Sequence, residues 1–124
     1  MEKKYPEEYY LFFEKFNEGE YYECHDLLEE IWMTEKNNKF LQGMLQVAVA
    51  IYHFQNGNIR GAKMLFNSAT NYLIPYQPRY WDLDIEPVLQ YIQTAIKVLP
   101  EEDRITIDEV KKIPFPILKL YLDV

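Results

Sequence analysis

The chain of 124 residues has little of several residue types, and each shortage excludes a class of protein. Its single cysteine, Cys24, cannot form an internal disulfide, and its first residues carry no apolar signal region, so we expect a cytoplasmic location. The longest apolar run, Val47 to Tyr52, is too short to cross a bilayer. We therefore expect no membrane partner.

Positive charge is also scarce. Thirteen Lys and Arg face twenty Asp and Glu, which gives a formal net charge of -7, and no basic cluster offers a local exception. Such a surface repels phosphate backbones, so we expect no nucleic-acid partner. Glycine-rich phosphate loops and the G-x-S-x-G, C-x-x-C and H-E-x-x-H patterns are absent, which disfavours the common nucleotide, hydrolase and zinc-finger chemistries. The sequence leaves open whether the protein is an enzyme.

Apolar residues are plentiful, at 48%, and aromatic residues reach 16% with eleven tyrosines. This composition predicts one helical domain over residues 1–124, with a core at 6–99 and a proline-containing tail at 100–124 that packs back on it. Hydrophobic residues recur at helical spacing and predict an all-α compact bundle of about five to six helices. The expected helices are residues 6–16, 20–33, 39–55, 59–73 and 84–99, with a short one at 108–112.

Two local features refine this prediction. The helix at 39–55 is apolar almost all round, which is typical of a central helix, and Asp84 is the expected N-cap of the helix at 84–99. Pro114 and Pro116 predict an extended tail. The tail residues expected to pack on the bundle are Ile117, Leu118 and Leu120.

Two segments of the sequence are similar to each other and indicate an internal repeat. Phe16-Asn17-Glu18-Gly19 precedes one helix as Phe54-Gln55-Asn56-Gly57 precedes another, 38 residues later, with Cys24 matching Ala62 and Leu27 matching Leu65. Similar glycine turns join the antiparallel hairpins of tetratricopeptide repeats. We therefore expect tetratricopeptide-like hairpins in the bundle.

The residues with chemical potential lie in an H-x-x-x-E-x-x-W segment formed by His25, Glu29 and Trp32. Residues four apart on a helix have Cβ atoms about 5 to 6 Å apart, so His25 and Glu29 can bind one metal, share a proton or form a hydrogen bond. On the helix at 39–55 three polar residues lie close together, within an arc of roughly 40° on a helical wheel. They are Gln42, Gln46 and His53.

Three interpretations of these side chains remain open. His25, Glu29 and His53 match a metal set for one zinc, iron or manganese ion, with Gln42 or Gln46 beside it. Alternatively they form a buried polar network that fixes helix register, or they line a small-molecule pocket. Other side chains have expected supporting roles: Trp32 packs in the core, Cys24 is buried and inert, and Arg60 pairs with Glu29 or Glu23.

Several separated blocks resemble one known family. They are Phe16-Asn17-x-Gly19-x-Tyr21-Tyr22-Glu23-x-His25-x-x-x-Glu29-x-x-Trp32, Leu41-Gln42-Gly43-x-x-Gln46, and Tyr52-His53-x-x-x-Gly57-Asn58-x-Arg60-Gly61-Ala62. In this order they resemble the small bacterial and archaeal helical proteins called domain of unknown function 309. The resemblance covers roughly residues 7–73 and implies an all-helical fold and a metal-binding or otherwise functional role for the histidine segment; it implies no particular reaction.

Two functional hypotheses follow. The first is a metal-binding protein that uses His25, Glu29 and His53. The second is a helical-repeat interaction module, a homo-oligomer, whose partner surface is the aromatic exterior around Tyr76, Tyr80 and Trp81. In the second hypothesis the His, Glu and Gln cluster is a structural polar network.

Overall fold

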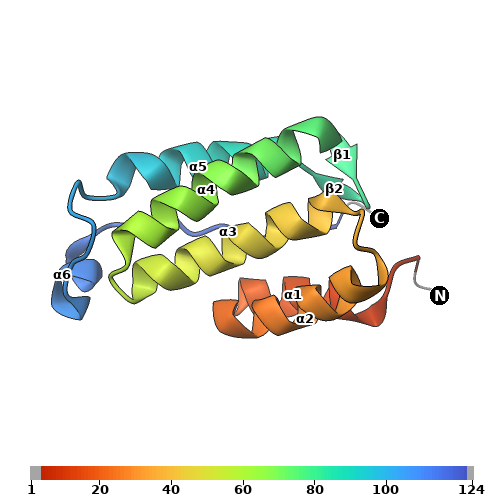
Figure 1. The fold of residues 1–124 in the computed structure, drawn as a ribbon, viewed down its shortest axis with the longest axis horizontal. Helices are drawn as coiled ribbons and strands as arrows, with labels where there is room; N and C mark the ends of the chain where they lie inside the picture. Colours follow the sequence, from red (N-terminus) through yellow and green to blue (C-terminus); the bar gives the residue numbers. More distant parts are fainter. Residues whose placement is uncertain (1–3, 123–124) are drawn as a thin grey trace.

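Six α-helices make up most of residues 4–122, the part of the chain that the structure, a computed structural model, describes (Figure 1). A 3-10 turn, η1 (Ile74–Tyr76), and two short antiparallel strands, β1 (Arg79–Tyr80) and β2 (Leu83–Asp84), join the fourth helix to the fifth. The predicted all-α bundle is confirmed. The helices are α1 (Glu7–Asn17), α2 (Tyr21–Thr34), α3 (Lys39–Gln55), α4 (Ile59–Leu73), α5 (Glu86–Val98) and α6 (Ile107–Lys112).

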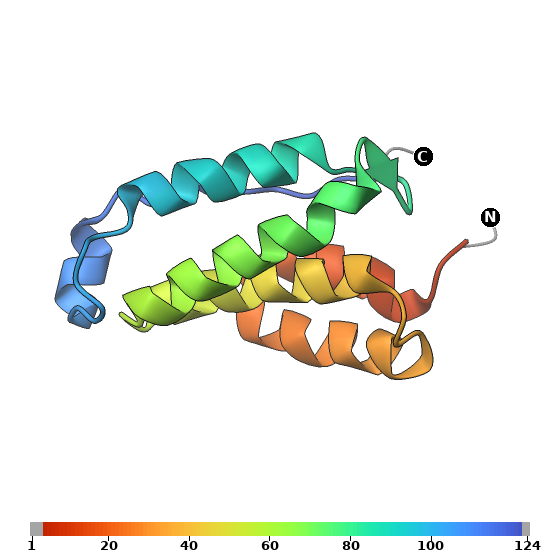
Figure 2. The ribbon, with the colours of Figure 1, turned by 45° about the horizontal axis from the view of Figure 1, so that its top comes forward.

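Helix α3 is central, as its all-round apolar sequence predicted. It packs against α2 on one side and α4 on the other, while α1 packs on α2 and α5 packs on α4 (Figures 1 and 2). Nine of its seventeen residues are buried, and eight of them, including Phe40, Val47 and Phe54, belong to one hydrophobic cluster. No helix within residues 4–122 is both long and apolar enough to span a membrane.

The two glycine turns have the same backbone geometry, which supports the internal repeat. Gly19 and Gly57 adopt φ values of +83° and +78°, a left-handed conformation that favours glycine. In each turn the glycine N–H donates to the carbonyl three residues earlier, and the next N–H donates to the carbonyl five residues earlier, which is the Schellman arrangement. The matched residues Cys24 and Ala62 are both fully buried. The wider likeness to tetratricopeptide hairpins stays a prediction.

Side-chain caps begin three of the helices, α3, α4 and α6, and one predicted cap is wrong. Asn38 Oδ1 accepts from the backbone N–H of Phe40 at the start of α3. Asp84 does not cap α5, which was the sequence prediction: α5 begins at Glu86, and the Asp84 carboxylate accepts from Arg79 Nε at 3.1 Å. The prediction was wrong because the short hairpin of β1 and β2, which the apolar pattern did not reveal, places Asp84 opposite Arg79.

The C-terminal tail crosses the molecule beside α5 and returns toward the end where the chain starts (Figure 2). Phe115 stacks on Phe54 with ring centroids 4.0 Å apart, and Leu120 is buried. The tail therefore packs on the bundle as predicted, except at Ile117, which is 76% exposed. Adjacent side chains of an extended segment point in opposite directions, so Ile117 faces solvent where its neighbours face the core.

Candidate functional site

His25 and Glu29 lie one turn apart on α2 and contact each other. Nδ1 of His25 is 3.4 Å from Oε2 of Glu29 and 3.5 Å from Oδ1 of Asp26. Ionised carboxylates only accept hydrogen bonds, so both contacts favour a proton on Nδ1 of His25. The side chains of His25 and Glu29 are 42% and 53% exposed, so the pair is accessible to a ligand from solvent.

His53 has the opposite arrangement because of Asn58. Asn58 caps α4: its Oδ1 accepts from the backbone N–H of Gly61 at 3.0 Å, which fixes the orientation of the amide. Its Nδ2 therefore donates to Nδ1 of His53, at 3.1 Å, and the neutral ring carries its proton on Nε2. Burial lowers the pKa of His53, and the positive charge of Arg104 lowers it further, so the neutral form is favoured.

The two imidazoles line one groove between α2 and α3, although they lie 28 positions apart in sequence. We call it the histidine groove; its volume is about 320 Å³. Tyr22 and Tyr52 form an aromatic contact across it, with ring centroids 5.3 Å apart. The lining residues are Tyr21, Tyr22, His25, Asp26, Val49, Tyr52 and His53.

The histidine groove therefore presents two complementary ring nitrogens. The contacts at Nδ1 favour a hydrogen-bond donor at Nε2 of neutral His53 and an acceptor at Nε2 of neutral His25. Neither Nε2 atom has a hydrogen-bond partner within residues 4–122. Such a pair can bind a molecule that offers both an acceptor and a donor, and His25 can accept a proton from it.

Trp32 and Gln42 lie apart from the imidazoles, in a second groove of the same α2–α3 interface. Glu29 also lines this second groove, and its contact with His25 links the two. Gln46 lines neither groove. Two buried atoms, Nε1 of Trp32 and Oε1 of Gln46, have no hydrogen-bond partner among the described residues. The prediction that Trp32 packs in the core was wrong: its side chain is half-buried, lies outside the core cluster and lines this groove.

The donor set of the predicted metal site does not fit a three-ligand ion in this arrangement. Within residues 4–122 no three His, Cys, Asp or Glu side chains gather where they could hold one ion. His53 is also poorly suited as a ligand, because Asn58 occupies Nδ1 and the proton sits on Nε2, whereas a metal needs a nitrogen lone pair. The metal itself stays a prediction.

Arg60 does not pair with Glu29 or Glu23, which corrects the sequence prediction. Its side chain is exposed, its backbone N–H donates to the Asp103 carbonyl at 3.0 Å, and its guanidinium forms no ion pair with either glutamate. The reason is topological. Arg60 begins α4, and α3 lies between α4 and α2, which carries both glutamates (Figure 1).

The three aromatic residues predicted as an interface are half-buried and pack within the molecule. Tyr76, Tyr80 and Trp81 all contact the ring of Phe40, with centroids 5.8, 5.1 and 6.2 Å away. The Tyr9 hydroxyl donates to the Trp81 carbonyl at 2.9 Å. These contacts attach the β1–β2 connector to α1 and α3. A role in association stays a prediction.

Cys24 behaves as a buried structural thiol. Burial raises its pKa to about 12, with smaller contributions from the carboxylates of Glu23 and Glu20. The thiol contacts the Phe12 carbonyl at 3.7 Å. A thiol with this pKa is protonated at neutral pH, so Cys24 is no nucleophile.

Sequence reasoning missed the contact of Asn58 with His53, and it missed Tyr22 and Tyr52 as groove residues. Asn58 had a usable signal, because an asparagine before a helical pattern is a common N-cap. The tyrosines had a weaker one. Their pairing depends on how α2 and α3 are aligned, which helical spacing within each segment does not determine.

The fold and the groove define a class: an all-helical protein with two imidazoles presented between its second and third helices. Residues 9–65 match the model of the family described as "Domain of unknown function (DUF309)", and this match confirms the family resemblance. The matched segment begins in α1 and ends in α4, so it contains the whole histidine groove.

Two curated relatives are similar to the chain. "Uncharacterized protein YpuF" of Bacillus subtilis (strain 168) is 29% identical over 119 residues, which cover 91% of this chain and 66% of that protein. An "Uncharacterized protein" of Aquifex aeolicus (strain VF5) is 37% identical over 46 residues, 35% of this chain and 14% of that protein. The chain thus spans about two thirds of the first relative's length and a small part of the second's. No solved structure matches the chain significantly.

Proposed function

We propose that this protein binds a small organic molecule in the histidine groove, held between the imidazoles of His25 and His53. The observation that carries the proposal is that an amide contacts Nδ1 of His53 while carboxylates contact Nδ1 of His25, because these contacts favour opposite tautomers of the two neutral rings. One offers a donor and the other an acceptor, on facing helices and at the same groove. A phenol or a primary amide has both matching groups, whereas a ketone or a carboxylate matches only the donor of His53.

The groove walls supply the remaining requirements of a small-molecule site. Ligand sites are concave, largely apolar and aromatic, and contain a few placed polar groups. Tyr22 and Tyr52 provide aromatic surface, and Val49 provides apolar surface. The two imidazoles are the polar groups that orient a ligand. The volume of about 320 Å³ lies at the small end of the range for ligand sites, which favours a compact ligand.

His25 gives the site the means for proton transfer as well as binding. The Glu29 carboxylate lies 3.4 Å from Nδ1 of His25 and so favours one orientation of the ring, in the way that a carboxylate orients the imidazole of a general base. In this proposal Nε2 of His25 takes a proton from the bound molecule, while Nε2–H of His53 stabilises negative charge that develops on its oxygen.

Nuclear magnetic resonance of the imidazole nitrogens tests the proposal. The protein is titrated with acetate, acetamide, acetone and phenol, and the ring signals of His25 and His53 are followed separately. The expected result is a saturable shift of both rings with at least one probe, lost in Tyr52→Ala. Gln55→Ala is the matched control, because Gln55 is an exposed residue of α3 outside the groove. Absence of any saturable shift, or an equal loss in the control, overturns the proposal.

A divalent metal remains a separate prediction with its own test. Elemental analysis of the purified protein, before and after incubation with zinc, iron or manganese, is compared with a His25→Ala, His53→Ala double variant. Near-stoichiometric metal that the double variant loses would favour metal binding over the small-molecule proposal.

A further inference from the structure

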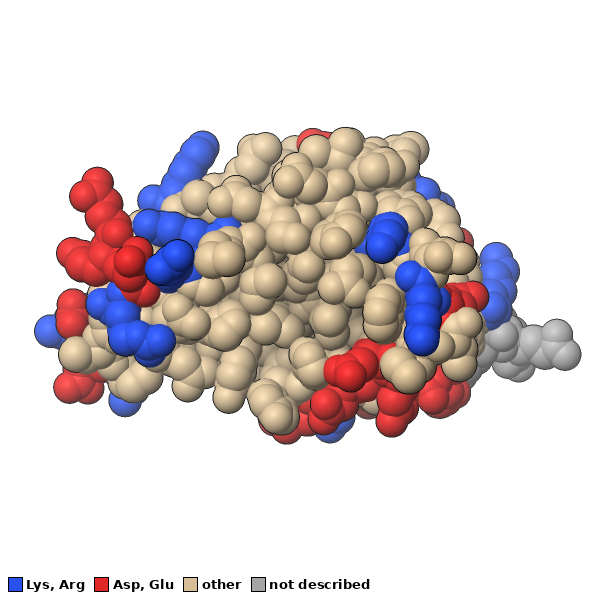
Figure 3. Space-filling view, viewed as in Figure 1, with Lys and Arg blue, Asp and Glu red and all other residues tan. Residues whose placement is uncertain are grey.

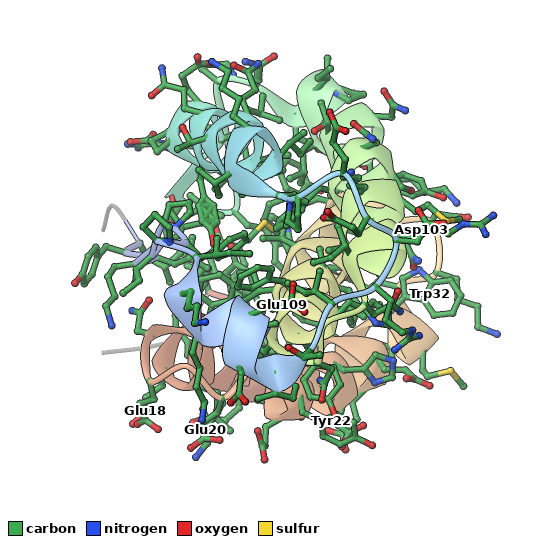
Figure 4. The ribbon with its side chains drawn as sticks, turned by 90° about the vertical axis from the view of Figure 1, so that its left-hand side faces the viewer. Glu18, Glu20, Tyr22, Trp32, Asp103 and Glu109 are labelled. Atoms are coloured by element: carbon green, nitrogen blue, oxygen red, sulfur yellow. The ribbon has the colours of Figure 1, made fainter. Side chains whose placement is uncertain are left out.

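The second groove between α2 and α3 shares only Glu29 with the proposed function. We call it the tryptophan groove. Its volume is about 190 Å³, and it combines an indole, a carboxylate and a primary amide on a floor of leucines. The lining residues are Leu28, Glu29, Trp32, Leu41, Gln42 and Leu45. Figure 4 shows Trp32 well away from Tyr22, which lines the histidine groove.

The polar groups of the tryptophan groove lack cationic partners in the protein. Glu29 contacts His25 but no Lys or Arg of the described chain, and its side chain is 53% exposed. The Gln42 amide has no hydrogen-bond partner within residues 4–122. The groove therefore offers a carboxylate and an amide oxygen, both of which accept hydrogen bonds from a ligand.

The charge of the surrounding surface favours a ligand with a positive charge. Three further carboxylates of α2, those of Glu23, Asp26 and Glu30, are exposed, and Figure 3 shows acidic side chains gathered over this helix. The net charge of the chain is -7. An anion would be repelled, and a neutral apolar molecule would cover the Glu29 carboxylate without compensating its charge.

We propose that the tryptophan groove binds an organic cation, a primary ammonium group on a short alkyl chain. The ammonium lies against the Trp32 indole, forms an ion pair with Glu29 and donates to the Gln42 carbonyl. Tryptophan is the aromatic side chain that attracts cations most strongly. The leucines contact the alkyl chain, and the volume admits about six groups of the size of a water molecule, which suits butylammonium.

Titration with n-butylammonium chloride tests this site, and 1-butanol serves as the uncharged probe of similar shape. The readout is the Trp32 indole N–H signal, one of only two indole signals because the chain has two tryptophans, and Trp32→Phe assigns it. Sodium chloride keeps the ionic strength constant. The expected result is a saturable shift with butylammonium and a much smaller one with butanol.

Two charge-removing variants on the same helix separate this site from general attraction. Glu29→Gln is expected to weaken butylammonium binding about tenfold, the effect of a lost charge-assisted hydrogen bond. Glu30→Gln removes the same charge from an exposed position outside the groove and is expected to leave binding within about twofold. Equal weakening by both variants, equal shifts with butanol, or no saturation overturns the proposal. Glu29 also contacts His25, but this test reads the Trp32 indole signal, whereas the test of the histidine groove reads the His25 and His53 ring signals with Glu29 intact, so the two proposals fail independently.

Discussion

Asn58 connects helix capping to the protonation of His53. One amide oxygen caps α4, and this orientation turns the amide nitrogen toward the His53 ring. A substitution that keeps the cap but replaces the amide donor can therefore change His53 without unfolding α4. Aspartate does this, because it is as good an N-cap as asparagine.

Asn58→Asp is expected to raise the pKa of His53 above its wild-type value. The new carboxylate accepts from Nδ1–H and favours the charged imidazolium, and the neutral ring changes to the Nδ1–H tautomer. The pKa is measured from the His53 ring signals as a function of pH. Asn56→Asp adds the same charge at an exposed position two residues earlier and should raise the pKa less. Equal increases in both variants would mean that Asn58 does not set the protonation of His53.

The lowered pKa of His53 also predicts how stability depends on pH. Between the native pKa and the ordinary value of 6.5, the unfolded chain binds more protons than the folded one, so the free energy of unfolding falls as pH falls below about 6.5. His53→Gln should remove this part of the dependence. Urea unfolding at pH 7 and pH 5 measures it. If the difference between wild type and variant is the same at both pH values, His53 does not have a lowered pKa.

At this scale the sequence predicted local contacts well and distant ones poorly. The spacing of His25 and Glu29 predicted their contact, because both lie on one helix. The predicted meeting of His53 with Glu29 depended on the alignment of two helices. In the structure His53 shares a groove with His25, whereas Glu29 lines the next groove along the interface.

Among the elements, the two glycine turns form a natural matched pair. A Cβ at Gly57 would lie 2.2 Å from the Ile105 carbonyl oxygen, whereas a Cβ at Gly19 would have no neighbour within 4 Å. Both glycines have positive φ, so an alanine at either position meets the same backbone strain. The difference in the free energy of unfolding between the two variants therefore measures the effect of the contact between residue 57 and the loop before α6.

Gly19→Ala is expected to lower the free energy of unfolding by about 1 kcal/mol, the cost of a left-handed alanine. Gly57→Ala is expected to lower it by about 3 kcal/mol, since overpacking against backbone adds to that strain. Chemical denaturation of both variants provides the comparison. Equal losses would show that the loop at Ile105 moves freely away from the turn.

The β1–β2 connector gives a second prediction for an element. Trp81→Ala is expected to lower the free energy of unfolding by about 2–3 kcal/mol, because a half-buried indole loses its contacts with Tyr5, Tyr9 and Phe40. Tyr121→Ala is the control, since that ring is 74% exposed.

Sedimentation at several protein concentrations separates packing from the predicted association. A structural Trp81 changes stability at every concentration and leaves the molecular mass in solution unchanged. An interfacial Trp81 would instead make association weaker in the alanine variant.

Helices were easier to predict than the elements between them. The boundaries of α3 and α4 agree with the sequence prediction at both ends, because long periodic segments flanked by Asn38, Gly57 and Asn58 define them. Strands β1 and β2 were missed, since two residues in each are too few to show alternation. Trp81 and Asp82, both at positive φ, form the turn between β1 and β2. Neither residue type strongly predicts such a turn.

For the molecule as a whole, the C-terminal tail closes the bundle through Asn17. The Asn17 amide donates to the Leu120 carbonyl at 2.8 Å, and its Oδ1 accepts from the Leu120 N–H at 2.7 Å. One side chain at the end of α1 thus satisfies both backbone groups of a buried tail residue 103 positions away. The first helix and the last described segment stabilise each other.

Asn17→Ala is expected to lower the free energy of unfolding by about 1–3 kcal/mol, because two backbone groups of Leu120 lose their partners. The loss should be local as well as global: hydrogen exchange at the Leu120 amide should accelerate more than exchange at buried amides of α3. Asn71→Ala, on the exposed face of α4, is the matched control and should change neither quantity. If Leu120 keeps its protection in Asn17→Ala, then Phe115 and the apolar contacts of the tail hold it in place, and closure of the bundle does not depend on the Asn17 amide.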